Sequence, residues 1–249
     1  MAVLSVVSLG TGSAEYLTRG GEAAMRNAKQ LVLRTGRSPI ASFLTEQGFD
    51  FDTLDDLYEQ CEDFDAFHQA AAVTLFSRMK EGDLCYVVSD AAFDGTVFAL
   101  QRLKPRDLEL RIVPGVSLAD CCLSLIKRQS GHVRIMSACE LEESKLLPDE
   151  PLLLCELYSR ECAGDCKLKL MELLPDELPV TLITGREEDG ALQAEEIPLM
   201  ELDRQEKYDH LMAVYIPPVP MEQRTRYDMD DLVRIMARLR SPEGCPWDR

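Results

Sequence analysis

The sequence lacks any long apolar run and has little positive charge. No segment of its 249 residues approaches the length of a membrane span, and the opening MAVLSVVSLG has no basic region typical of a secretory signal. Lysine and arginine number 27 against 44 aspartates and glutamates, which gives a formal charge of −17. This charge repels nucleic-acid phosphates and anionic lipid. We therefore expect a soluble, cytoplasmic protein that binds neither nucleic acid nor a membrane.

Histidine is scarce, and the common catalytic constellations are missing. His68 lies in a predicted helix, and His132 and His210 begin predicted strands. None neighbours a serine or cysteine in a G-x-S-x-G sequence, so we expect structural or surface roles for all three. The catalytic residues are therefore unknown at this point.

The nine cysteines are odd in number and irregularly spaced, and most lie in apolar stretches. This pattern favours reduced thiols that fill the core of a cytoplasmic protein. Cys162 and Cys166 are one helical turn apart, but no second pair or histidine cluster accompanies them. We interpret them as two small residues on a helix and predict no metal site.

What the first half does contain is a regular alternation of short apolar runs with helical patterns, which predicts β-α units on a largely parallel sheet. We expect strands at 2–9, 30–35, 83–89 and 108–115, and helices at 17–28, 39–48, 54–61, 63–82, 93–103 and 117–127. Ser117 is a plausible N-cap of the last of these helices.

From residue 132 the pattern becomes richer in strands and predicts a second domain with a mixed sheet. Strands are expected at 132–138, 151–158, 179–185 and 210–218, a hairpin arm at 191–202, and a helix at 162–174. A proline-rich linker, 216–226, leads to a final amphipathic helix that stops before Pro242 and Gly244. Its apolar stripe should dock on the body of the domain, pair with a neighbouring chain, or be poorly ordered.

Four loops follow strand ends, where ligands bind in open α/β sheets. In the first, LGTGSAEYLT, Gly10 and Gly12 permit close backbone approach, but the third glycine of a dinucleotide fingerprint is replaced by Glu15. A tight turn without a ligand is the alternative for these glycines. The second loop carries Asp90, which either binds a ligand's hydroxyl groups or caps the next helix.

The third loop is the Pro-Gly turn of IVPGVSLAD, and the fourth is the strand end at Ser137 and Ala138. Close packing is the alternative role for the two small residues of the fourth loop. The acidic runs DDLYEQCEDFD and GREEDG are typical of solvated faces and loops, so no carboxylate pair is assigned to acid-base work.

Six segments of the sequence form a recognisable series: VVSLGTGSAEYLT, DLCYVVSDAAFDGTVFAL, LRIVPGVSLADCCLSL, VRIMSAC, PLLLCELYS and PVTLITG. In their order and spacing, these segments resemble the tetrapyrrole methylase family, the class III S-adenosylmethionine-dependent methyltransferases. The resemblance covers roughly residues 3 to 217. It implies an α/β fold of two domains, with a mainly parallel sheet in the N-terminal half, a mixed sheet in the C-terminal half and a cofactor cleft between them. It also implies S-adenosylmethionine as cofactor, a small-molecule methyl acceptor, and commonly a homodimer.

The resemblance also implies which residues contact the methyl donor. The family's first loop, G-x-G-P-G, corresponds to residues 10–14, where the proline is replaced by Ser13 and the last glycine by Ala14. Its G-D-P loop corresponds to Ser89, Asp90 and Ala91, which keep only the acid. The expected donor-contacting residues are Ser13, Ser89, Asp90, Ala91, Val116, Ser117, Ser137, Ala138, Leu157 and Thr184.

The tail resembles the opening of a MazG-type nucleoside triphosphate pyrophosphohydrolase domain, on the basis of an LxxIMxxLR helix followed by GCPWD. This implies domains at 1–116 and 117–217, then a linker and leader helix at 218–249, with the catalytic part of the MazG-type domain beyond Arg249. Two functions stay open: an active methyltransferase, or a non-catalytic binding or dimerisation module that regulates the pyrophosphohydrolase in cis.

Overall fold

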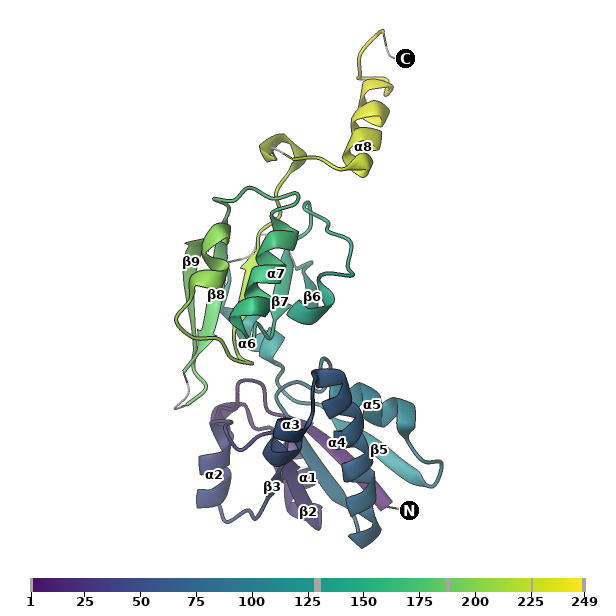
Figure 1. The fold of residues 1–249 in the computed structure, drawn as a ribbon, viewed down its shortest axis with the longest axis vertical. Coiled ribbons are helices and arrows are strands. Elements are labelled where there is room, and N and C mark those ends of the chain that lie inside the picture. The colour runs from purple at the N-terminus through teal and green to yellow at the C-terminus, as the bar shows by residue number, and fades with distance from the viewer. Residues whose placement is uncertain (1, 128–130, 187–188, 225, 248–249) are drawn as a thin grey trace. The chain divides into compact units, whose positions relative to one another are not determined.

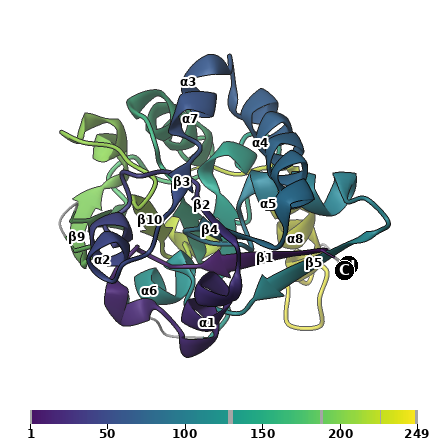
Figure 2. The ribbon, with the colours of Figure 1, turned by 90° about the horizontal axis from the view of Figure 1, so that it is seen from below.

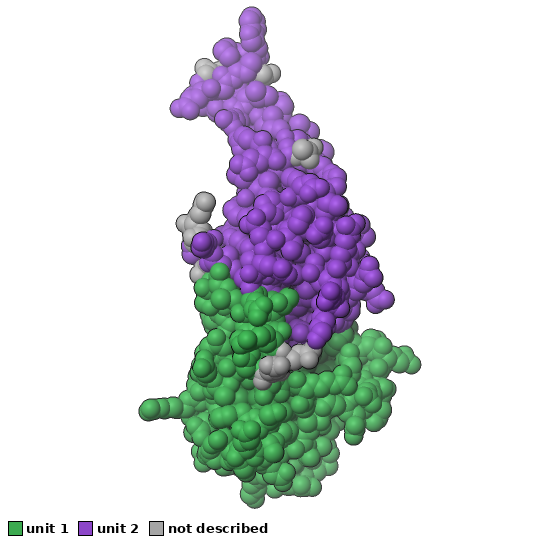
Figure 3. All heavy atoms as spheres, turned by 90° about the vertical axis from the view of Figure 1, so that its left-hand side faces the viewer, with its two compact units in different colours: residues 1–125, 184–193 green, residues 126–183, 194–249 purple. Residues whose placement is uncertain are grey.

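The computed structural model describes residues 2–127, 131–186, 189–224 and 226–247. The chain divides into two compact units, coloured separately in Figure 3. Unit 1 consists of residues 1–125 with 184–193, and unit 2 of residues 126–183 with 194–249. Among the described residues, no helix is long and apolar enough to cross a membrane.

Unit 1 is built on a parallel sheet of five strands in the order β3-β2-β4-β1-β5 (Figure 1). The strands are β1 Ala2–Ser8, β2 Gln30–Leu33, β3 Asp52–Thr53, β4 Leu84–Val88 and β5 Leu108–Val113. The helices are α1 Arg19–Asn27, α2 Ile40–Glu46, α3 Asp55–Gln60, α4 Phe64–Arg78, α5 Gly95–Leu103 and α6 Leu118–Leu125, with 3₁₀ turns η1 Ala14–Tyr16 and η2 Met79–Glu81.

Side chains alternate across this sheet and form two cores. In β4, Leu84 and Tyr86 face the core that contains Phe67 of α4 and Val97 of α5. The intervening Cys85 and Val87 face the core formed with α1 and α2. A parallel strand buried on both faces reads as a continuous apolar run, which is the pattern of LCYVV. Figure 2 shows α4 and α5 side by side.

Unit 2 is built on a mixed sheet in the order β6-β7-β10-β8-β9, in which β10 runs antiparallel to β7 and β8, and β6 runs parallel to β7. The strands are β6 Arg134–Ser137, β7 Leu152–Cys155, β8 Pro179–Gly185, β9 Leu192–Pro198 and β10 Ala213–Ile216. The helical elements are η3 Ala138–Glu140, α7 Arg160–Leu170, η4 Leu199–Arg204, η5 Met221–Gln223 and α8 Met229–Leu239.

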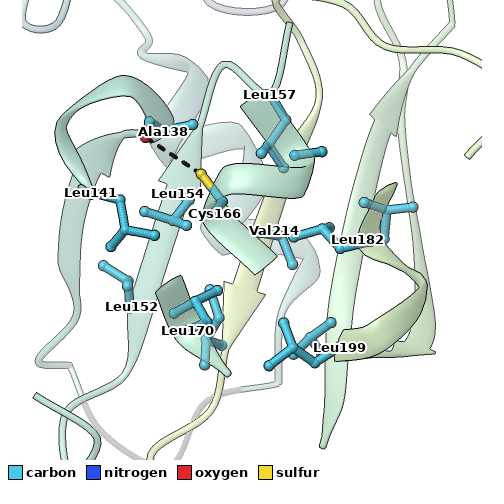
Figure 4. Packing of buried hydrophobic residues seen from close by; sticks show 14 of the residues in the cluster. Ala138, Leu141, Leu152, Leu154, Leu157, Cys166, Leu170, Leu182, Leu199 and Val214 are labelled. Atoms are coloured by element: carbon cyan, nitrogen blue, oxygen red, sulfur yellow. Dashed lines mark hydrogen bonds between the residues drawn. The ribbon is translucent and has the colours of Figure 1, made fainter. Parts of the chain in front are cut away.

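Helix α7 and turn η4 pack on one face of this mixed sheet. Leu154 of β7, Val214 of β10 and Leu182 of β8 contribute to the core on that face, together with Leu170 and Leu199 (Figure 4). The α/β class, the parallel sheet and the mixed sheet predicted from the sequence are confirmed.

The structure differs from the expected elements at two places. Strand β3 was not predicted, because two residues are too few to show a period. The expected arm 191–202 forms a strand only as far as Pro198 and then turns into η4, where Leu199 and Leu202 are buried.

Helix α8 is joined to unit 2 by ion pairs rather than by its apolar face. Arg224, whose side chain is fully buried, lies 3.0 Å from the carboxylate oxygens of both Asp149 and Asp231. Asp231 also forms a capping box with the N-cap residue Asp228. Leu232 and Met236, in contrast, are 48% and 44% exposed. The ion pairs therefore hold the N-terminal end of α8, whereas its apolar stripe is not covered by the described residues.

Candidate functional site

Three loops converge at the carboxyl edge of the parallel sheet in unit 1, because they follow the neighbouring strands β4, β1 and β5. The Gly10 amide donates to the Ser89 carbonyl at 2.8 Å, which joins the loops after β1 and β4. The Ala91 amide donates to the Ser8 hydroxyl at 3.0 Å. The structure thus places Ser89 and Ala91 beside the first loop.

The glycines of the first loop have left-handed backbones, with φ of 60° at Gly10 and 82° at Gly12. A Cβ on Gly10 would lie 3.1 Å from the Val116 carbonyl oxygen, and one on Gly12 would lie 2.7 Å from the Ser38 hydroxyl. Both glycines are therefore required for contacts within unit 1. The tight turn proposed as their alternative role is present.

The chain itself covers the middle of this loop. Gly190 is buried against it, and a Cβ there would lie 2.5 Å from the Thr11 carbonyl oxygen. Thr11 is only 1% exposed, and its hydroxyl has no hydrogen-bond partner among the described residues. Ser13 lies further along, where its hydroxyl accepts from the Glu15 amide and caps η1. A ligand reaching this edge would meet Ser13 rather than Thr11.

Asp90 is the clearest ligand-binding candidate at the edge. It is 7% exposed; its Oδ1 accepts from the Ala92 amide at 3.0 Å, and its Oδ2 has no partner of normal geometry among the described residues. Burial raises the pKa of Asp90, and the charges of Asp120 and Asp94 raise it further, whereas the amides of Ala92 and Leu118 lower it. A buried acceptor that no described donor meets in normal geometry calls for a functional explanation.

The proposal that Asp90 caps the following helix is wrong. The N-cap of α5 is Asp94, whose side chain accepts from the Val97 amide. The four-residue shift arises because the segment after β4 first forms a turn, in which the Asp94 amide donates to the Asp90 carbonyl at 3.0 Å. Asp90 is thus left available for a role other than capping.

The third loop packs against the end of β1. A Cβ on Gly115 would lie 2.7 Å from the Ser8 carbonyl oxygen, so the turn approaches β1 more closely than a side chain allows. The Ser117 hydroxyl donates to Asp120 at 2.8 Å and accepts from the Asp120 amide at 3.0 Å. Ser117 therefore begins α6 as predicted, and its hydroxyl is already engaged. Val116 contributes its carbonyl beside Gly10.

A polar group behind the Asp90 loop was not predicted from the sequence. Arg34, directly after β2, forms an ion pair with Asp94 at 2.8 Å. Beside it, His68 Nδ1 of α4 lies 3.0 Å from the Thr96 hydroxyl of α5. Burial lowers the pKa of His68, while Asp94 raises it and Arg34 lowers it. These contacts hold α5 and its preceding loop against α4 and β2.

In unit 2, Ser137 and Ala138 lie together at the end of β6, whereas Leu157 follows β7. The Leu157 side chain is fully buried in the core with Ala138, and its amide donates to the Met212 carbonyl at 3.0 Å. Only its carbonyl oxygen could serve a ligand. Thr184 lies near the end of β8, in the segment grouped with unit 1.

Glu156 is a further candidate that sequence reasoning missed. It is the only described non-glycine residue with a left-handed backbone, at φ 64°, and its Oε2 lies 3.3 Å from the Ser137 hydroxyl. Such backbone conformations are uncommon outside glycine and often lie at functional sites. The sequence signal was slight: a glutamate directly after the apolar run LLLC.

These residues suit binding and alignment better than acid-base or metal chemistry. The described residues contain no group of three or more histidine, cysteine, aspartate or glutamate side chains that could hold a metal ion. The edge instead offers backbone carbonyls, small side chains and one buried carboxylate oxygen without a hydrogen bond of normal geometry among the described residues. S-adenosylmethionine carries hydroxyl and ammonium donors, which match that oxygen, so the residues at Asp90 fit this cofactor.

Comparison with known proteins identifies the family of the chain. Residues 3–184 match the family model of tetrapyrrole (corrin/porphyrin) methylases. The chain is 30% identical over 250 residues to the YabN protein of Bacillus subtilis (strain 168), covering 99% of this chain and 51% of the relative. It thus spans about half the length of that protein.

Two solved structures share the fold. The uroporphyrin-III-C-methyltransferase of Thermus thermophilus is similar with a TM-score of 0.62 and 15% identity, over 88% of this chain and 95% of that one. The precorrin-6Y methylase of Archaeoglobus fulgidus is similar with a TM-score of 0.59 and 13% identity, over 88% of this chain and 99% of that one. Taken with the family match over most of the sequence, the chain belongs to the tetrapyrrole methylase family, a family of S-adenosylmethionine-dependent methyltransferases.

Proposed function

We propose that this chain binds S-adenosylmethionine and transfers its methyl group to a small-molecule acceptor. The observation that carries the proposal is the buried Asp90 carboxylate, whose Oδ2 has no hydrogen bond of normal geometry among the described residues, at the strand edge where α/β proteins bind ligands. Family membership supplies the reaction class, and the position of Asp90 supplies a residue to hold the donor.

When bound, the cofactor supplies an electrophilic methyl group on a sulfonium. Asp90 would accept hydrogen bonds from donor hydroxyl groups, and the small side chain of Ala91 would leave room beside it. Further donor contacts in unit 1 would come from Ser13, Ser89, Val116 and Ser117, and from Thr184 of β8. Those in unit 2 would come from Ser137, Ala138 and Leu157. In-line displacement requires alignment and exclusion of water more than a strong base, which agrees with this residue set.

The test is calorimetric titration with S-adenosylmethionine and its demethylated product, S-adenosylhomocysteine. We expect saturable binding that weakens by about 10-fold to 100-fold in Asp90→Asn, since a hydrogen bond to a charged group contributes roughly 1.5–3 kcal/mol. Asp107→Asn, at an exposed aspartate of unit 1, is the matched control and should bind as the wild type does. Absence of heat at millimolar ligand would refute donor binding.

A second function is favoured by the covered first loop. Gly190 packs on Thr11, and the loop lacks the proline and final glycine of its family. On this alternative, residues 1–116 and 117–217 form a non-catalytic, homodimeric module, and residues 218–249 lead into a MazG-type pyrophosphohydrolase in cis. Nucleotide hydrolysis by a longer protein, with and without residues 1–217, tests it. Unchanged kinetics and oligomer size would exclude this role.

A further inference from the structure

Asp90 and Asp94 stand at the two ends of one tight turn in unit 1. The Asp90 carbonyl oxygen accepts from the amides of Phe93 at 3.3 Å and Asp94 at 3.0 Å. Both carboxylates are removed from solvent, since Asp90 is 7% exposed and Asp94 is 2% exposed. The turn thus joins the candidate ligand-binding carboxylate to a second buried carboxylate.

The carboxylate of Asp94 has a donor on each of its oxygens. Its Oδ1 accepts from the Val97 amide at 3.1 Å and so caps α5. Its Oδ2 accepts from Nη1 of Arg34 at 2.8 Å. Arg34 follows β2, and its own amide donates to the Val87 carbonyl of β4 at 2.9 Å. The guanidinium that pairs with Asp94 is therefore carried by backbone that is fixed to the sheet.

The first turn of α5 is packed too closely to shift when the surroundings of Asp94 change. His68 Nδ1 of α4 lies 3.0 Å from the Thr96 hydroxyl of α5, and Figure 2 shows the two helices side by side. A Cβ on Gly95 would lie 2.4 Å from Cδ2 of His68, so the helices approach here as closely as glycine allows. A movement of the Asp94 carboxylate toward solvent is therefore taken up by residues 90–93.

We propose that Arg34 is a positioning residue for Asp90: by pairing with Asp94, it keeps the turn closed and the Asp90 carboxylate out of water. A buried carboxylate that loses its cation is strongly disfavoured and must reach solvent. The turn would have to open for Asp94 to do so, and Asp90 would be hydrated with it. The use of the held carboxylate by the methyl donor rests on the proposed function, whereas the restraint itself does not.

The pKa of Asp90 distinguishes this positioning role from a purely electrostatic one. Burial raises that pKa, and the charges of Asp120 and Asp94 raise it further, whereas two backbone amides lower it. If the turn stays closed when Arg34 is removed, the uncompensated charge of Asp94 raises the pKa of Asp90 further. If the turn opens, water reaches the carboxylate, and its pKa falls toward the ordinary value of 3.8.

The experiment compares Arg34→Met with the wild type in the absence of any ligand. Carboxyl-carbon NMR of labelled aspartate measures the pKa of Asp90, and amide exchange measures the hydrogen bonds of Phe93 and Asp94. We expect the pKa to fall and the exchange of both amides to accelerate at least about 10-fold, because both donate to the Asp90 carbonyl. A raised or unchanged pKa, or unchanged exchange, would overturn the proposal.

Three further variants show whether the buried charge is the cause. Arg34→Lys keeps a cation and should retain slow exchange and a raised pKa. Arg34→Met combined with Asp94→Asn removes both charges but keeps a capping side chain, so it should close the turn again. Arg37→Met is the matched control and should behave as the wild type does, because the pair of Arg37 with Glu59 is exposed. A double variant as open as Arg34→Met would overturn the proposal, since the loss would then not come from the buried charge.

Titration with S-adenosylhomocysteine separates this inference from the proposed function. If the wild type binds the ligand, Arg34→Met should bind it at least about 10-fold more weakly, and the double variant should recover the affinity. Equal binding by Arg34→Met and the wild type would overturn the positioning role. If the wild type does not bind, the proposed function fails, while the pKa and the amide exchange of the ligand-free chain still decide whether Arg34 positions Asp90.

Discussion

At the scale of the residue, Asp90 combines a cost in stability with a candidate role in binding. Its carboxylate is buried, its Oδ2 has no hydrogen bond of normal geometry among the described residues, and burial raises its pKa. The folded protein thus disfavours the charged form that predominates at neutral pH. A residue that lowers stability in this way is typical of a site kept for function.

Replacing Asp90 by asparagine should therefore stabilise the fold at neutral pH while it weakens donor binding. The pKa of Asp90 in the folded protein is raised above the ordinary value of 3.8, so the folded state binds more protons than the unfolded state between these two pKa values. The stability of the wild type therefore falls as the pH rises from 3.8 through the raised pKa. We expect the free energy of unfolding of Asp90→Asn to exceed that of the wild type by about 1 kcal/mol at pH 7, and this difference to vanish below pH 3.8. Urea denaturation across pH measures this, and a variant destabilised at pH 7 would contradict it.

Gly12 permits a second residue-scale test. Gly12 and Gly48 both have a left-handed backbone, at φ 82° and 77°, but a Cβ on Gly48 meets no atom within 4 Å. We expect Gly48→Ala to cost about 1 kcal/mol from backbone strain alone. Gly12→Ala should cost roughly 1–3 kcal/mol more, because its Cβ meets Ser38 and Pro39. Denaturant titrations of both variants measure the difference, and equal losses would show that the first loop can relax.

At the scale of the element, the sequence predicted those helices and strands whose structure depends on the local residue pattern. Apolar runs predicted the strands, and Ser117 was identified as the start of α6, because capping depends on neighbours in the chain. Contacts between distant segments had no such signal. The packing of Gly190 on Thr11, the backbone of Glu156 and the pairing of Arg34 with Asp94 all arise from tertiary structure.

The same contrast applies to α8. Its amphipathic pattern could be predicted from the sequence, but the buried pairing of Arg224 with Asp149 and Asp231 could not. A helix of this length has marginal stability alone, so we infer that these ion pairs hold its first turn.

Replacing Arg224 by methionine should release α8 from unit 2. Removal of Arg224 leaves the buried Asp231 carboxylate without its cationic partner, which typically costs about 3–5 kcal/mol. We expect amides of α8 to exchange with solvent at least about 100-fold faster, while the sheet of unit 2 keeps its protection. Arg238→Ala is the control, because its pair with Glu222 is exposed and should change little. Unchanged exchange in Arg224→Met would show that other contacts hold the helix.

At the scale of the whole molecule, each unit holds some of the residues that the family resemblance assigns to the methyl donor. The best-supported residue, Asp90, lies on the parallel sheet of unit 1, whereas Ser137, Ala138 and Leu157 lie in unit 2. The family assignment covers both, since the match extends over residues 3–184. Methyl transfer by this chain thus depends on whether the edge around Asp90 still accepts the donor.

The most direct measurement is amide hydrogen exchange of the chain with and without saturating S-adenosylhomocysteine. We predict slower exchange at 12–13, 89–92 and 116–118, with a smaller effect at 137–139 and none in α8. If millimolar ligand leaves exchange at the Asp90 loop unchanged, this chain does not bind the donor there, and only the shared ancestry of its fold with the methylases stands.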